Sequence, residues 1–117
     1  MMPDANTISA WEVTQELIPK LNAVEEQIES TLKAILNTHQ EPDEIERYTK
    51  FWGEFQLELM MIRMNLENLF KRYHRELEAA INDPRKDILL TLDQHETIAV
   101  ENARQLHNRV QRLQQKR

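Results

Sequence analysis

Apolar residues recur at steps of three and four along most of the chain, and the first such run follows a helix-start signal. A step of three or four keeps residues on one face of an α-helix. Ser9 and Glu12 have the spacing of a capping box, in which each side chain bonds an unpaired backbone N–H of the other residue. We therefore predict a helix over about 10–38 after a disordered tail over 1–8. Its stripe consists of Val13, Leu17, Leu21, Val24, Ile28, Leu32 and Ile35.

Pro19 interrupts this first helix near its beginning. A proline ring clashes with the carbonyl four residues earlier, here that of Gln15, and proline has no N–H to donate. We therefore expect a kink or a short break at this point.

The second run has the most regular pattern in the chain. It alternates steps of three and four without a miss, which is a heptad pattern and predicts left-handed packing like that of a coiled coil. Pro42 suits the first position of a helix, and a lone Gly53 inside it costs only about 1 kcal/mol. We predict a helix over about 42–82. Its seam consists of Ile45, Tyr48, Trp52, Phe55, Leu59, Ile62, Leu66, Leu69 and Tyr73.

A third run follows the sequence Asn82-Asp83-Pro84, in which Asp83 can cap a helix that begins at Pro84. We predict this helix over about 84–115. Two short connections make neighbouring helices antiparallel. The predicted fold class is therefore all-α: residues 1–117 form a single domain, an antiparallel up-down-up bundle of three long helices with coiled-coil-like packing. The third stripe consists of Ile88, Leu92, Ala99, Ala103, Leu106, Val110 and Leu113.

The composition agrees with long helices and narrows the setting. The chain has one glycine, no cysteine and 30% charged residues. Without cysteine there is neither a disulfide nor a thiolate metal site. There is no apolar run of about 18 residues, and residues 1–10 lack the basic and apolar regions of a signal peptide. We expect a soluble, cytoplasmic protein with no membrane partner.

Charge is distributed unevenly along the chain. Residues 1–46 contain ten acidic and two basic side chains, and residues 47–117 contain ten acidic and thirteen basic ones. Cations near the end of a helix stabilise its dipole, which accounts for most of the final basic residues. An anionic partner is the alternative explanation. The candidate contacts for such a partner are Arg104, Arg109, Arg112, Lys116 and Arg117.

No arrangement of residues points to catalysis. No histidine follows a glutamate by three residues, as in helical di-iron sites, and no His-Glu-x-x-His zinc motif occurs. A single glycine cannot form a phosphate-binding loop. We therefore predict a protein that is not an enzyme and has no cofactor, no metal ion and no catalytic residue.

One segment of the second helix departs from the pattern of an isolated bundle. Leu57, Met60, Met61 and Met64 fall on heptad positions that face away from the seam and are normally polar. Either the other two helices wrap this helix broadly and bury these residues, or they form a contact surface for another molecule. Methionine suits such a surface because its flexible thioether adapts to a partner.

These observations favour a non-enzymatic protein-protein interaction module, such as an adaptor, a chaperone or a structural subunit. We expect it to associate with itself or with another protein through Leu57, Met60, Met61 and Met64. The alternative is a nucleic-acid-binding accessory protein that uses the basic C-terminal helix. The net charge of −5 and the absence of aromatic residues among the last basic positions argue against nucleic acid.

Overall fold

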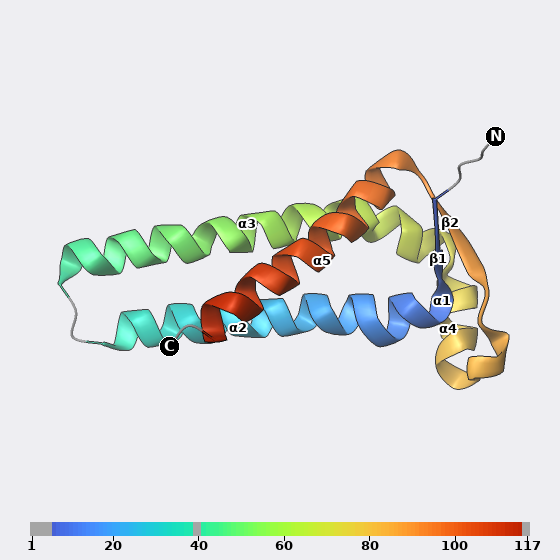
Figure 1. Cartoon of the computed structure of the whole chain (residues 1–117), viewed down its shortest axis with the longest axis horizontal. Helices are drawn as coiled ribbons and strands as arrows, with labels where there is room; N and C mark the ends of the chain where they lie inside the picture. Colours follow the sequence, from blue (N-terminus) through green and yellow to red (C-terminus); the bar gives the residue numbers. More distant parts are fainter. Residues whose placement is uncertain (1–5, 39–40, 116–117) are drawn as a thin grey trace.

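Three long helices pack side by side in a computed structural model that describes residues 6–38 and 41–115 (Figure 1). They are α2 (Ile18–Asn37), α3 (Pro42–Arg72) and α5 (Gln94–Gln115). Helix α3 runs antiparallel to the other two, which confirms the predicted all-α, up-down-up bundle. Its heptad residues Leu59, Ile62, Leu66 and Leu69 are buried between α2 and α5.

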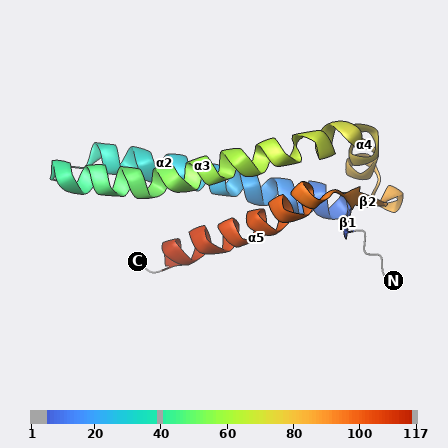
Figure 2. The same cartoon turned by 90° about the horizontal axis from the view of Figure 1, so that it is seen from above.

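The molecule is elongated, because the hairpin of α2 and α3 extends beyond the end of α5 (Figures 1 and 2). Its extents are 54 × 33 × 25 Å and its radius of gyration is 17.1 Å, against about 13 Å for a compact chain of this length. The predicted seam is therefore buried only in its second half. Near the uncovered end, Tyr48 and Phe51 are exposed.

Part of the predicted N-terminal tail, residues 1–8, is a strand rather than a disordered segment. Strand β1 (Asn6–Ser9) pairs antiparallel with β2 (Leu89–Leu92), with Ile8 opposite Leu90. Ile8, Leu90 and Leu92 are buried against the helices, so the pairing is stabilised by the same apolar core. Residues 1–5 lie outside the described residues.

The predicted helix over 84–115 is wrong in its first ten residues. Asp83 does cap a helical turn, accepting a hydrogen bond from the Arg85 N–H at 3.0 Å, but this 3₁₀ turn ends at Lys86. The chain then forms β2, because the apolar run at Leu89–Leu92 alternates between the core and the outside with the period of a strand. Helix α5 begins only after Asp93.

The predicted helix over 42–82 is also divided. Tyr73 has φ −110° and ψ 24°, which ends α3, and the chain turns into the short helix α4 (His74–Asn82). Leu77 and Ala80 of α4 are buried, and this helix packs against the start of the first helical segment. The turn at Tyr73 thus closes one end of the bundle, which a straight helix would leave open.

Near Pro19, where the sequence predicts a kink or a short break, the helix continues through a π-helical turn. Helix α1 (Ala10–Glu12) is followed by a π-helical turn at Val13–Leu17, and the Ile18 N–H donates to the carbonyl of Val13. This wider turn accommodates the missing N–H of Pro19 without ending the helix. Upstream, Ser9 caps α1 by accepting the Glu12 N–H at 2.9 Å, which is one half of the predicted capping box, while the Glu12 carboxylate pairs with Arg104.

Candidate interaction surface and adjoining polar junction

An exposed apolar surface lies on the side of α3 that faces away from the seam. It consists of Leu57, Met60, Met61 and Met64, whose exposed fractions are 54%, 51%, 56% and 68%. At 100° per residue, these four side chains fall within an arc of about 100° on the helix. We call this surface the methionine face. The structure thus excludes the alternative in which the other helices bury these residues.

The methionine face borders a groove between α2 and α3 with a volume of about 340 Å³. Met60 and Met64 line the groove together with Ile28 and Leu59. Arg63 spans its polar side, donating to Glu25 at 2.8 Å and to Asn22 at 3.1 Å. The face therefore combines exposed, flexible apolar side chains with a shallow depression that a partner side chain can fill.

Of the basic residues predicted to contact an anionic partner, two described arginines form ion pairs within the molecule and a third is exposed. Arg104 pairs with Glu12, which belongs to the acidic N-terminal part of the chain. Arg109 pairs with Glu58 and lies over the ring of Phe55, 5.4 Å from its centroid. Arg112 is exposed. Lys116 and Arg117 fall outside the described residues. Two of the three described arginines therefore neutralise acids within the molecule.

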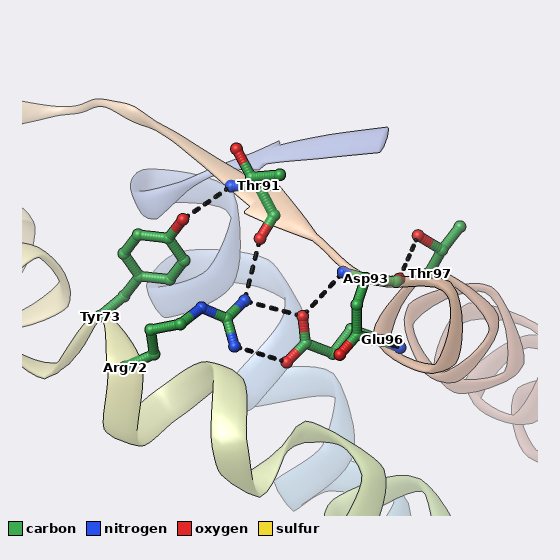
Figure 3. A network of polar contacts seen from close by, with 6 residues as sticks. All are labelled: Arg72, Tyr73, Thr91, Asp93, Glu96 and Thr97. Carbon is green, nitrogen blue, oxygen red and sulfur yellow. Dashed lines mark hydrogen bonds and ion pairs between the residues drawn. The ribbon is translucent and has the colours of Figure 1, made fainter. Parts of the chain in front are cut away.

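A polar junction that the sequence analysis missed joins α3, β2 and α5 (Figure 3). Glu96 is only 1% exposed, and Arg72 binds both of its carboxylate oxygens, at 2.8 and 3.0 Å. Glu96 also completes a capping box: it accepts the Asp93 N–H at 2.9 Å, while Asp93 accepts the Glu96 N–H at 2.7 Å. The spacing Asp93-x-x-Glu96 was the available signal, and it marks the true start of α5.

The same junction covers the outer edge of β2. The Tyr73 hydroxyl accepts the Thr91 N–H at 3.2 Å, and Arg72 donates to the Thr91 carbonyl at 3.0 Å (Figure 3). The hydrogen bond from Thr91 lowers the pKa of Tyr73, and the hydrogen bonds to Glu96 raise the pKa of Arg72. Because these groups bond one another and the backbone, the junction holds α3, β2 and α5 together.

His107 on α5 is a further ionisable group with a shifted pKa. Burial lowers its pKa, and the positive charge of Lys20 lowers it further. Among the described residues its Nδ1 atom has no hydrogen-bond partner, and its other ring nitrogen lies 3.4 Å from the Gln111 amide. It lines a shallow cleft of about 320 Å³ between α2 and α5 together with Glu26, Ser30 and Gln111. Among the described residues, no group of histidine and acidic side chains there could hold a metal ion.

Two further findings concern the described part of the chain and its relatives. Within residues 6–38 and 41–115, no helix has both the length and the apolar character needed to cross a bilayer. No family model matches the chain, and neither a curated protein nor a solved structure matches it.

Proposed function

We propose that this chain is a non-enzymatic helical module for protein-protein interaction, and that it associates through the methionine face of α3. The observation that carries this proposal is the exposure of four large apolar side chains on adjoining turns of one helix. A contiguous group of exposed large apolar side chains typically marks an interaction site, because covering it with a partner removes apolar surface from water.

The elongated shape supports the same conclusion. An elongated bundle offers a long side surface for contact with a partner, and α3 runs along most of the length of the molecule (Figure 2). The apolar residues of such a face supply affinity, and the charges around it set orientation and partner choice. An adaptor, a chaperone or a structural subunit would each use the face in this way.

The alternative, a nucleic-acid-binding protein that uses α5, has less support. Ion pairs with Glu12 and Glu58 already hold Arg104 and Arg109. Binding phosphate would require breaking these pairs, and the chain is acidic overall. We expect no salt-sensitive binding to DNA or RNA at micromolar protein, as measured by fluorescence anisotropy.

The proposal is tested by comparing two triple variants. One changes Met60, Met61 and Met64 to Gln, which keeps helix propensity and removes the apolar side chains. The matched control changes three other exposed apolar residues, Leu36, Ile81 and Ile98, to Gln. Each protein is examined by thermal unfolding, by light scattering and by capture of associated proteins from the source organism.

We expect the methionine-face variant to unfold at a temperature close to that of the wild type, since its substituted positions are exposed. It should lose self-association or a captured protein, whereas the control should keep both. A face variant that retains every association of the wild type would overturn the proposal.

A further inference from the structure

The methionine face is the middle of a longer stripe along the outer side of α3. The stripe begins at Glu46 and continues with steps of four and three to Lys71, which makes a second heptad seam about 38 Å long. Seven of its side chains are exposed and Gly53 is half-buried, while α2 and α5 cover the opposite side of the helix. The stripe consists of Glu46, Lys50, Gly53, Leu57, Met60, Met64, Glu67 and Lys71.

The stripe is complementary to the same stripe of a second copy that runs in the opposite direction. An acid and a base stand at one end, an acid and a base stand at the other, and apolar residues lie between them. If a second copy lies antiparallel with the twofold axis between Glu58 and Leu59, every charge on the stripe meets its opposite. The facing pairs are then Glu46 with Lys71, Lys50 with Glu67, Gly53 with Met64, and Leu57 with Met60, each pair occurring twice.

Other arrangements of the same stripe are less favourable. A parallel pair in register places Glu46 against Glu46 and Lys50 against Lys50, and like charges facing each other are destabilising. Moving the antiparallel pair by one heptad in one direction sets Lys50 against Met60. Moving it in the other direction sets Leu57 against Glu67. Only the register centred between Glu58 and Leu59 matches apolar residues with apolar residues and acids with bases.

Gly53 gives a second, steric reason for this register. A methyl group there would have no atom within 4 Å apart from the helix's own nearby backbone, so packing within one molecule does not require a glycine. In the antiparallel pair, Gly53 lies opposite Met64 of the second copy. Met64 is the most exposed side chain of the methionine face, at 68%, and the missing side chain of Gly53 leaves room for it.

We propose that two copies of this chain pair through α3, antiparallel and in this one register. The inference rests on the proposed function, because it takes the methionine face as the contact surface and identifies a second copy as the occupant. The two copies would bury their apolar centres against each other, and ion pairs would fix the direction and the register.

The test exchanges charges on the stripe. Lys50→Glu alone and Glu67→Lys alone each place like charges opposite one another, so each should raise the dimer dissociation constant at least tenfold. In a heterodimer of the two variants, the acid introduced at position 50 of one chain meets the base introduced at position 67 of the other. The unchanged Glu67 of the first chain likewise meets the unchanged Lys50 of the second.

A mixture of the two variants should therefore form a heterodimer about as tight as the wild-type dimer. The matched controls, Arg75→Glu and Glu78→Lys on α4, should leave the dimer unchanged in sedimentation velocity. A mixture that dimerises no better than either variant alone would contradict the register.

Disulfide trapping reports the direction of pairing independently, because the chain has no cysteine of its own. An equimolar mixture of Leu57→Cys and Met60→Cys proteins should cross-link on oxidation far more than either protein alone. A parallel pair would instead cross-link each single-cysteine protein with itself, and that result would overturn the proposal.

The outcomes separate this inference from the proposed function. A wild type that stays monomeric at about 100 µM rules out the dimer, while capture of another protein by the methionine face would still support the function. A dimer that Met60→Gln, Met61→Gln and Met64→Gln abolish but the charge exchanges do not affect overturns the register alone. A dimer that none of these changes affects overturns both.

Discussion

Replacing Arg72 with leucine tests whether the polar junction stabilises the fold. The change keeps much of the aliphatic packing and removes the two hydrogen bonds to Glu96 and the one to the Thr91 carbonyl. Glu96, at 1% exposure, then retains the Asp93 N–H as a donor but loses its countercharge. A buried carboxylate without a countercharge is the main destabilising consequence.

The magnitude follows from burial and from the number of bonds. Breaking a buried ion pair by removing one partner costs about 3–5 kcal/mol. The Arg72 side chain is 37% exposed, so water can replace part of its interaction with Glu96. We therefore expect the free energy of unfolding to fall by about 2–3 kcal/mol, which corresponds to roughly 10 °C in melting temperature for a chain of this length.

Urea unfolding followed by far-UV circular dichroism measures this change, and a second variant identifies its cause. Glu96→Gln should cost less, because its amide oxygen can still accept the Asp93 N–H. In the Arg72→Leu, Glu96→Gln double variant no charge remains buried, so it should be more stable than the sum of the two single changes implies. Strict additivity, or an Arg72→Leu protein within about 0.5 kcal/mol of the wild type, would refute the argument.

Three further changes test other parts of the fold. Ile8→Ala should lower the free energy of unfolding by about 2–4 kcal/mol, because Ile8 is 3% exposed. Thr7→Ala on the exposed side of β1 is the control. Equally small effects of the two changes would contradict the packing of β1 against the core. Gly53→Ala should raise the free energy of unfolding of the monomer by up to about 1 kcal/mol, as measured by urea unfolding. The same methyl group should weaken the α3 dimer, as measured by sedimentation velocity. Burial and Lys20 hold the pKa of His107 below its ordinary value of 6.5, so the unfolded chain binds the proton more tightly. The contribution of neutral His107 to the free energy of unfolding should be complete above pH 6.5 and should be lost as the pH drops from 6.5 through the lowered pKa. His107→Gln should remove this dependence of the free energy of unfolding on pH. A dependence that persists in the variant would assign it to other groups.

The helices were predictable because their signals are local. Steps of three and four at Val13–Ile35 and at Leu59–Leu69 identify the buried faces, and Pro19 indicates the irregular turn that the structure shows at Val13–Leu17. The methionine face was identified by the same method, because apolar residues stood at positions that the seam leaves outside. Its exposure is now established, and its role as a contact surface stays a prediction.

The missed features depend on contacts between distant segments. Strand β1 is four residues long, and nothing near it indicates a partner more than 80 residues away. Leu89–Leu92 is a short apolar run that suits a helix or a strand equally from sequence alone. At Tyr73 the heptad continues although α3 ends: the ring packs against the core, and the hydroxyl accepts the N–H of Thr91 in the distant strand β2.

The pairing of β1 with β2 constrains the order in which the chain can fold during synthesis. Asn6 lies opposite Leu92 and Ser9 lies opposite Leu89, so β1 cannot find its partner until residues 89–92 have left the ribosome. At about 5–20 residues per second, this leaves an interval of several seconds. The α2–α3 hairpin needs only neighbouring residues and can form within that interval. Ile8 would remain uncovered meanwhile. Because closing so long a loop costs entropy, we expect the strands to pair last, after the helices have assembled and shortened the distance between them.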